Sequence, residues 1–350
     1  MSDHVFEQLA DALNELPNGF PRTPSKIEIK ILKKIISPEE AALACKLTGS
    51  YETIGAIAKR VGLPAGEIQK PLINMVRRGV VWLNKVNGRP RFRLAPFIVG
   101  IYESQAELMD HELAHLVEDY LAHGGADGIM KPQPAIHRVI PAQHAVKTES
   151  VLPYDDVRKI LLNANSFHVS DCICRLQQDQ LGSRECDFPL NMCLGFSVEV
   201  HSPGPGYISR EDALAILDKS EEIGLVHTVS NVMQGVGYVC NCCGCCCGIL
   251  RSINEFGIKD SVAYANYYAV IDAEVCAGCG DCIARCQVHA ISSDVEGFSV
   301  VDREHCIGCG LCVTGCANEA AQLVRKADAD IIQPPVDFAA WEQARLQNRG

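Results

Sequence analysis

The sequence predicts an α+β protein built from several domains, and three observations lead to this expectation. The chain has 350 residues, which is enough for two or three domains of ordinary size. Its N-terminal third combines helical patterns with a strand–turn–strand pattern. Eighteen of its 19 cysteines lie between Cys172 and Cys316, and the last eight belong to a duplicated segment. The chemistry is therefore concentrated in the C-terminal half.

The composition is that of a packed globular protein, with 47% apolar and 21% charged residues, and it excludes a wholly disordered chain. We expect no membrane insertion, because apolar runs such as Phe97–Tyr102 are too short to span a bilayer. Met1–Leu16 does not resemble a secretory signal, so the expected location is cytoplasmic. Cytosolic thiols are kept reduced, which favours metal or iron–sulfur ligation over a disulfide scaffold.

The first segment contains four helical patterns followed by two strand patterns. The helices are expected at Ile27–Ile36, Pro38–Leu47, Ile54–Val61 and Ala65–Arg78, and the strands at Val80–Leu83 and Arg91–Leu94, joined by a turn at Asn87–Gly88. Helix, turn, helix and a basic hairpin together resemble a winged-helix domain. Pro71 falls inside the second of the paired helices, where proline normally bends or shortens a helix.

Basic residues are concentrated in this same segment, although the net charge of the chain is −11. Residues 22–93 hold 15 Lys and Arg against five acids. A basic cluster is expected at Arg77, Arg78, Lys85, Arg89, Arg91 and Arg93. Such a cluster contacts DNA phosphates or docks a protein, and the acidic chain and Pro71 make DNA the less favoured partner.

The C-terminal part contains an internal repeat with a period of 30 residues. Residues 269–276 align with 299–306, and each copy leads into a run of four cysteines with spacing x2, x2, x3. The runs are Cys276, Cys279, Cys282, Cys286 and Cys306, Cys309, Cys312, Cys316. Short gaps wrap one loop around a small object, and Gly278, Gly280, Gly308 and Gly310 let the backbone approach it.

This spacing resembles the bacterial-type ferredoxin with two 4Fe–4S clusters. The resemblance implies a β-α-β repeat and crossed ligation, in which the fourth cysteine of each run serves the other cluster. One cluster would be held by Cys276, Cys279, Cys282 and Cys316, and the second by Cys306, Cys309, Cys312 and Cys286. Gln287 and Ala317 stand where the family usually has proline. Zinc, which also binds paired cysteines, is the alternative.

Ten further cysteines lie upstream, and packing alone does not explain six of them within eight residues. They are Cys172, Cys174, Cys186, Cys193, Cys240, Cys242, Cys243, Cys245, Cys246 and Cys247. They are interpreted as ligands of one or two more 4Fe–4S clusters, with Cys172, Cys174, Cys186 and Cys193 as one natural set unless the two runs are mixed. The alternatives are a thiol–disulfide site around Cys242 and Cys243 and a zinc site. The segment resembles a cysteine-rich module found upstream of ferredoxin domains in anaerobic redox proteins.

We therefore expect five segments: a winged-helix-like domain (1–110), a helix and connector (111–155), a cysteine-rich iron–sulfur domain (156–265), a two-cluster ferredoxin domain (266–326) and a tail (327–350). The helical pattern before the connector covers Glu103–His123, and further helices are expected at Ser209–Ile223 and Phe338–Leu346.

The predicted function is one-electron transfer in an anaerobic redox system, with a redox protein or a larger oxidoreductase complex as partner. No residue is singled out as a nucleophile or general base, so the chain is interpreted as an electron-transfer subunit rather than a catalytic one. The alternatives are a redox-sensing DNA-binding regulator and a disulfide-type reductase that uses the run Cys240–Cys247.

Overall fold

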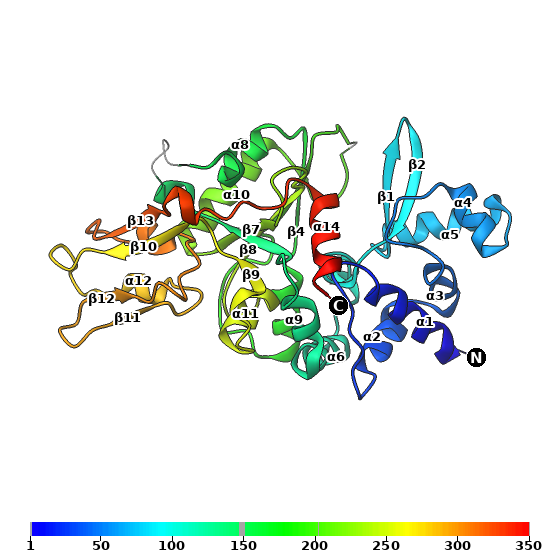
Figure 1. Ribbon diagram of the computed structural model, residues 1–350, viewed down its shortest axis with the longest axis horizontal. Coiled ribbons are helices and arrows are strands. Elements are labelled where there is room, and N and C mark those ends of the chain that lie inside the picture. The colour runs from blue at the N-terminus through cyan, green and yellow to red at the C-terminus, as the bar shows by residue number, and fades with distance from the viewer. Residues whose placement is uncertain (1, 147–150, 202, 350) are drawn as a thin grey trace. The chain divides into compact units, whose positions relative to one another are not determined.

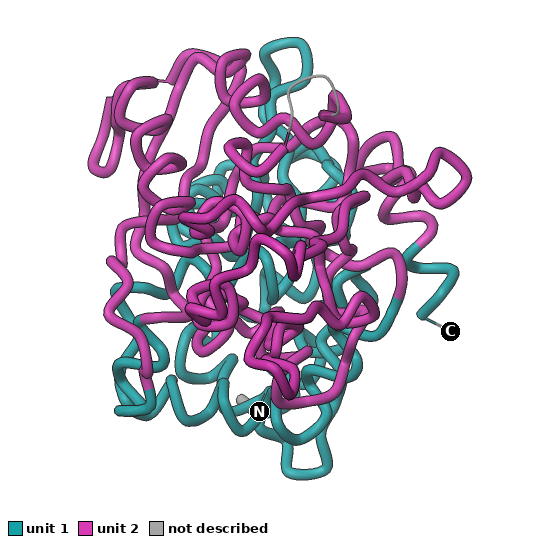
Figure 2. The backbone as a smooth tube through the Cα atoms, turned by 90° about the vertical axis from the view of Figure 1, so that its left-hand side faces the viewer, with its two compact units in different colours: residues 1–132, 176–183, 345–350 teal, residues 133–175, 184–344 magenta. Residues whose placement is uncertain are grey.

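The computed structural model describes residues 2–146, 151–201 and 203–349, and it is a mixed α/β structure with several sheets (Figure 1). The chain divides into two compact units (Figure 2). Unit 1 contains residues 1–132, 176–183 and 345–350, and unit 2 contains 133–175 and 184–344. Residues 147–150 of the predicted connector lie outside the described residues. The five segments expected from the sequence stay predictions.

Unit 1 contains the expected helices and hairpin. The elements are α1 (Ser2–Asn14), α2 (Ile27–Ile35), α3 (Pro38–Ala44), α4 (Ile54–Val61), α5 (Ala65–Arg77), β1 (Val81–Val86) and β2 (Arg89–Leu94). Ser37 and Glu40 form a reciprocal capping box at α3, and Thr53 caps α4. Helix α5 continues through Pro71. The identity of this region as a winged helix stays a prediction.

The single helix expected at Glu103–His123 is wrong in its first part. Short 3-10 turns occupy Tyr102–Ser104 and Ala106–Leu108, and α6 begins only at His111 and ends at Tyr120. A new helix begins after Asp110 because its carboxylate accepts a hydrogen bond from the backbone N–H of Leu113 (2.9 Å) and caps the helix. Helix α7 (Ala126–Met130) follows.

The last residues of the described chain complete unit 1. Arg345, near the end of α14 (Phe338–Gln347), has a fully buried side chain. Its guanidinium donates hydrogen bonds to the backbone carbonyls of Pro17 (2.8 Å), Ile129 and Pro132. One side chain thereby ties the C-terminal helix to two segments that are far apart in the sequence, around Pro17 and around residues 129–132.

Unit 2 is organised around a seven-stranded sheet with the order β6-β4-β5-β8-β7-β3-β9. The strands are β3 (His137–Ile140), β4 (Ser166–Ser170), β5 (Cys193–Ser197), β6 (Tyr207–Ile208), β7 (Val226–Ser230), β8 (Tyr238–Cys242) and β9 (Val262–Ala263). All neighbours pair antiparallel except β3 and β9. The helices of this unit are α8 (Val157–Leu162), α10 (Arg210–Ile223) and α11 (Gly248–Asn254). Helix α9 (Ile173–Leu181) begins in unit 2, and its residues from 176 onward belong to unit 1.

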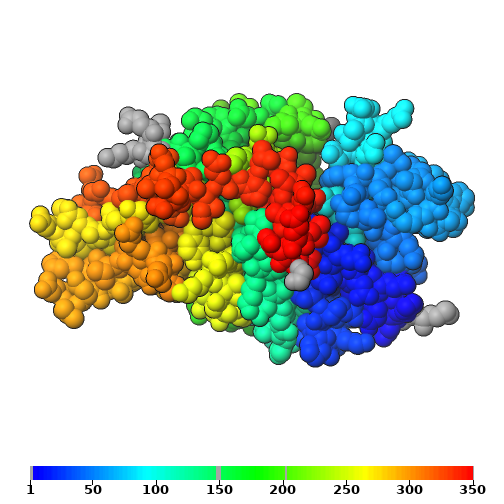
Figure 3. All heavy atoms as spheres, viewed as in Figure 1, coloured from blue at the N-terminus to red at the C-terminus, as the bar shows by residue number. Residues whose placement is uncertain are grey.

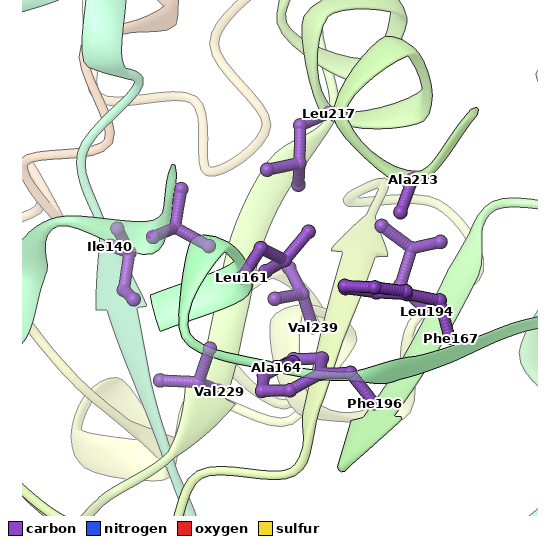
Figure 4. Close-up of a cluster of buried hydrophobic side chains, with 11 residues drawn as sticks. Ile140, Leu161, Ala164, Phe167, Leu194, Phe196, Ala213, Leu217, Val229 and Val239 are labelled. Atoms are coloured by element: carbon purple, nitrogen blue, oxygen red, sulfur yellow. The ribbon is translucent and has the colours of Figure 1, made fainter. Parts of the chain in front are cut away.

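One face of the sheet packs an apolar core against α8 and α10 (Figure 4). Strand residues Leu194, Val229 and Val239 meet Leu161 of α8 and Leu217 of α10, and all five are buried. Helix α10 has the predicted capping box of Ser209 and Asp212, and Gly224 caps its C-terminal end. Because side chains alternate along a strand, the neighbours of Val239 point to the opposite face.

The C-terminal part of unit 2 consists of two similar halves. Its elements are β10 (Tyr267–Ile271), α12 (Asp281–Ala284), β11 (Ile291–Ser293), β12 (Ser299–Val301), α13 (Leu311–Thr314) and β13 (Ala321–Arg325). The outer strands β10 and β13 pair antiparallel, and so do the inner strands β11 and β12. Among the described residues, no helix combines the length and the apolar character that a membrane crossing requires.

Replacing Leu217 by Ala should lower the free energy of unfolding of unit 2 by about 2–5 kcal/mol, because the change leaves a cavity between α10 and the sheet. Thermal unfolding of the intact protein measures the shift. Leu162→Ala is the matched control, since Leu162 on α8 is 50% exposed whereas Leu217 is 1% exposed. Equal destabilisation by both changes would contradict the assignment of this core.

Candidate metal centres

All 19 cysteines are free thiols, and the structure gathers 18 of them into four groups. Two groups lie in the C-terminal repeat and two lie beside the seven-stranded sheet. The remaining cysteine, Cys45, belongs to unit 1, where its thiol is directed to the backbone carbonyl of Ala42 (3.4 Å).

The first group consists of the cysteines that the resemblance assigns to one cluster. Cys276, Cys279, Cys282 and Cys316 line a single cavity together with Ser299. The Cys282 thiol is 3.2 Å from the Ser299 hydroxyl. Backbone hydrogen bonds from Ser299 and Gly278 lower the pKa of Cys276, so the local backbone favours the thiolate that a metal requires.

The second group contains Cys286, Cys306, Cys309 and Cys312. Burial, reinforced by the negative charges of Cys306 and Cys286, raises the pKa of Cys312 to about 12. Backbone N–H groups point at two of the sulfurs, from Ala269 to Cys306 (3.5 Å) and from Ala290 to Cys286 (3.2 Å). Because its pKa is raised, the buried Cys312 thiol needs a cation to be held as a thiolate. The ligand role of the eight cysteines in both groups stays a prediction.

The glycines of the two loops adopt the left-handed conformation that the turns require, at Gly278, Gly280, Gly308 and Gly310. Gly308 shows why no larger residue fits: a Cβ atom there would lie 2.3 Å from the carbonyl oxygen of Tyr267.

Six thiols form a closed ring on the sheet face opposite the apolar core. In ring order they are Cys172, Cys174, Cys247, Cys242, Cys240 and Cys193, and each thiol interacts with the next. We call this set the six-thiol ring. Hydrogen bonds from Cys240 and Cys247 lower the pKa of Cys242 to about 6, so the ring favours a thiolate at this position.

Secondary structure places the ring cysteines. Cys240 and Cys242 are two residues apart on β8 and therefore share a face. The pairing of β5 with β8 puts Cys193 beside Cys240. Cys172 and Cys174 lie at the start of α9, and Cys247 is the N-cap residue of α11.

The fourth group is compact, and we call it the thiol quartet. It consists of Cys186, Cys243, Cys245 and Cys246, whose sulfur atoms all lie within 4.8 Å of one another. Three of them are on the turn between β8 and α11, and Cys186 comes from the loop before β5. The quartet mixes the two cysteine runs, so the set of Cys172, Cys174, Cys186 and Cys193 considered from sequence is not the one the structure assembles.

Arg175 lies between the two upstream groups, and its side chain is fully buried. It donates hydrogen bonds to the carbonyl oxygens of Pro189 (2.9 Å) and Asn241 (2.8 Å). Burial opposes its charge, but the thiolates of Cys172 and Cys243 outweigh burial and raise the pKa of Arg175. A fixed cation is thus available to stabilise negative sulfur in both groups.

Gln287 connects the repeat to the upstream cysteines. Its side-chain oxygen accepts a hydrogen bond from the N–H of Gly244 (2.7 Å), and its side-chain amide donates to the carbonyl of Gly224 (2.9 Å). Gln287 follows Cys286, and Gly244 separates Cys243 from Cys245. Gln287 stands where the family usually has proline, and its contact with Gly244 was not predicted from the sequence.

The basic residues of unit 1 are partly engaged within the unit. Arg78 pairs with Glu40 and also donates to the carbonyl of Ile35. Arg93 is buried and lies over the rings of Tyr51 and Trp82. Lys85 and Arg89 on the hairpin are exposed. The six positions therefore do not form one free basic surface.

Comparison with known families adds a direct finding for the repeat. The family model of the 4Fe–4S dicluster domain matches residues 268–317. A search of curated proteins and a search of solved structures each found no match. With the matched domain and the adjacent cysteine-rich region, the chain is an iron–sulfur protein, and both features support 4Fe–4S binding and an electron-transfer role.

Replacing Cys316 by Ser should remove the cluster held with Cys276, Cys279 and Cys282 and leave the cluster near Cys306 in place. We expect the loss of about four irons and four inorganic sulfides per chain, with one of the two dicluster signals lost from the EPR spectrum of the reduced protein. The control is Cys45→Ser, which should change neither quantity. Loss of the cluster near Cys306 instead would contradict the crossed ligation.

Proposed function

We propose that the chain transfers single electrons between a partner oxidoreductase and a series of iron–sulfur clusters in unit 2, within a low-oxygen redox system. Two 4Fe–4S clusters would occupy the matched dicluster domain, and a third would occupy the six-thiol ring. The observation that carries the proposal is the hydrogen bond between Gln287 and Gly244, because it joins the residue that follows Cys286 of the repeat to a glycine inside the upstream cysteine run.

The donor set of the six-thiol ring suits an iron–sulfur cluster. Iron–sulfur clusters take thiolate ligands, and the ring offers six sulfurs from several elements. Within residues 2–146, 151–201 and 203–349, no three thiols outside the quartet lie all within 4.8 Å of one another. The ring is therefore wider than the quartet, as are the two cysteine sets of the dicluster domain.

Hydrogen bonds fix the repeat against the rest of unit 2. The Arg285 guanidinium donates to the backbone carbonyls of Glu221 (2.7 Å) and Glu222 (2.9 Å), which lie near the end of α10. The N–H of Ala142 donates to the carbonyl of Cys309 (2.8 Å). Asn254 of α11 donates to the carbonyl of Gln287 (3.0 Å). The clusters supply the one-electron chemistry, and these contacts hold their ligand loops at fixed separations.

Electrons would enter or leave through the first cysteine group of the repeat. Among the 19 cysteines, all within the described residues, only Cys279 is exposed. Residues of the matched domain, yellow to orange in the space-filling view, are open to solvent on the face seen (Figure 3). Val275, Val295 and Val300 add exposed apolar surface to the same domain. A partner that docks there would reach one cluster at short range.

The cluster complement tests this function. We expect about twelve cluster irons and twelve inorganic sulfides per chain in anaerobically purified protein, and about eight of each when Cys172, Cys174 and Cys193 are all replaced by Ser. Three replacements are needed because the ring has six thiols, and one or two replacements would still leave the four thiolates that a 4Fe–4S cluster needs. EPR signals of the dicluster domain should persist in the variant, which shows that it is folded. About eight irons in the unaltered protein would reject the third cluster.

A further inference from the structure

The thiol quartet differs from the other thiol groups in how closely its sulfurs approach. The sulfur of Cys186 is 3.8 Å from that of Cys243 and 3.7 Å from that of Cys246, and the sulfurs of Cys245 and Cys246 are 3.6 Å apart. The remaining pairs of the quartet lie within 4.8 Å. None of these distances is a disulfide bond, so the four thiols are separate donors converging on one point.

These distances match a tetrahedron around one metal ion. Metal–thiolate bonds of about 2.3 Å in tetrahedral geometry place the four sulfurs about 3.8 Å apart. A 4Fe–4S cluster requires a wider arrangement, because four irons and four sulfides occupy its centre and each thiolate binds a different iron. Within the described residues, no three cysteines of the dicluster domain lie as close together as those of the quartet.

We propose that Cys186, Cys243, Cys245 and Cys246 bind a single tetrahedral divalent ion, Zn²⁺ or Fe²⁺, as four thiolates. Four thiol protons leave when the ion binds, and no electron is transferred. This single-ion site differs in kind from the proposed series of clusters. It rests on the proposed electron-transfer function in one respect, which is that the ion would lie next to the electron-transfer centres.

The surroundings of the quartet fit a dianionic tetrathiolate centre. Cys243 and Cys246 are almost completely buried. The Arg175 guanidinium lies over the ring of Phe188 and donates a hydrogen bond to the carbonyl of Pro189. These two contacts fix the position of the loop that carries Cys186. A buried cation next to a centre of net charge −2 offsets part of the cost of removing that charge from water.

The position of the ion implies a structural role. Gly244 lies between two of the ligands, and its N–H donates a hydrogen bond to the side-chain oxygen of Gln287. A Cβ atom at Gly244 would be 2.1 Å from the carbonyl oxygen of Gln287. Asn254 also donates to the carbonyl of Gly244 (3.3 Å). An ion that closes the turn from Cys243 to Cys246 would therefore fix the surface on which the dicluster domain is docked.

The test compares metal and sulfide in the intact, anaerobically purified protein and in Cys186→Ser. We expect one zinc or one extra iron per chain in the intact protein, and loss of that single ion in the variant with inorganic sulfide unchanged. Elemental analysis identifies the ion. For zinc, X-ray absorption at the zinc edge should give one shell of four sulfurs at about 2.3 Å and no metal neighbour. For iron, the ferric form should give the EPR signal of an isolated high-spin ion.

Two results would overturn the proposal. Loss of about four irons together with about four sulfides in Cys186→Ser would mean that the quartet holds a cluster, and no loss of any metal would leave it a thiol site. The control Cys45→Ser removes a cysteine outside all four groups and should change nothing. The test asks whether Cys186→Ser loses one metal ion while the amount of inorganic sulfide per chain stays the same. This comparison does not depend on whether the six-thiol ring holds a cluster.

Discussion

The two-residue period of β8 is the constraint on which the arrangement of unit 2 depends. Val239 points into the apolar core with α8 and α10, so Cys240 and Cys242 must point to the other face. The turn that follows carries Cys243, Cys245 and Cys246 beyond the end of the strand. One short segment thus supplies sulfur to two separate groups, and the sheet separates the six-thiol ring from the core. A shift of one residue in the register of β8 would bury thiols in the core and expose valine to the thiol face.

Electrostatics shapes these groups as strongly as backbone geometry does. Packing many ionisable sulfurs together is unfavourable unless a cation compensates for their charge. Arg175 provides one fixed positive charge between the six-thiol ring and the thiol quartet, and bound metal would provide the rest. In the second group of the repeat, the pKa of Cys312 is raised to about 12 by burial and by the neighbouring sulfurs. These sulfurs become good donors only in the presence of metal, which couples binding to the release of protons.

The sequence predicted local features, such as helix caps and turns, better than it predicted which distant residues come together. Helix α10 has the capping box at Ser209 and Asp212, and the hairpin β1–β2 has its turn at Asn87–Gly88, because neighbouring residues decide both. The break before α6 was missed because the helical pattern continues across Asp110. The sequence did not predict that the thiols of Cys186 and Cys243 lie in one group, since this depends on how loops far apart in the sequence meet. The contact of Gln287 with Gly244 had one signal, an unexpected residue where the family usually has proline.

The burial of Arg345 bears on the order in which this protein is made. Its guanidinium ties together the carbonyls of Pro17, Ile129 and Pro132 in unit 1. A ribosome synthesises all of the cysteine-bearing segments before it reaches residue 345. The upstream cysteines, of which Cys247 is the last, are synthesised 98 residues before the side chain that completes the N-terminal unit. Cofactor insertion can therefore precede completion of the unit whose sequence comes first.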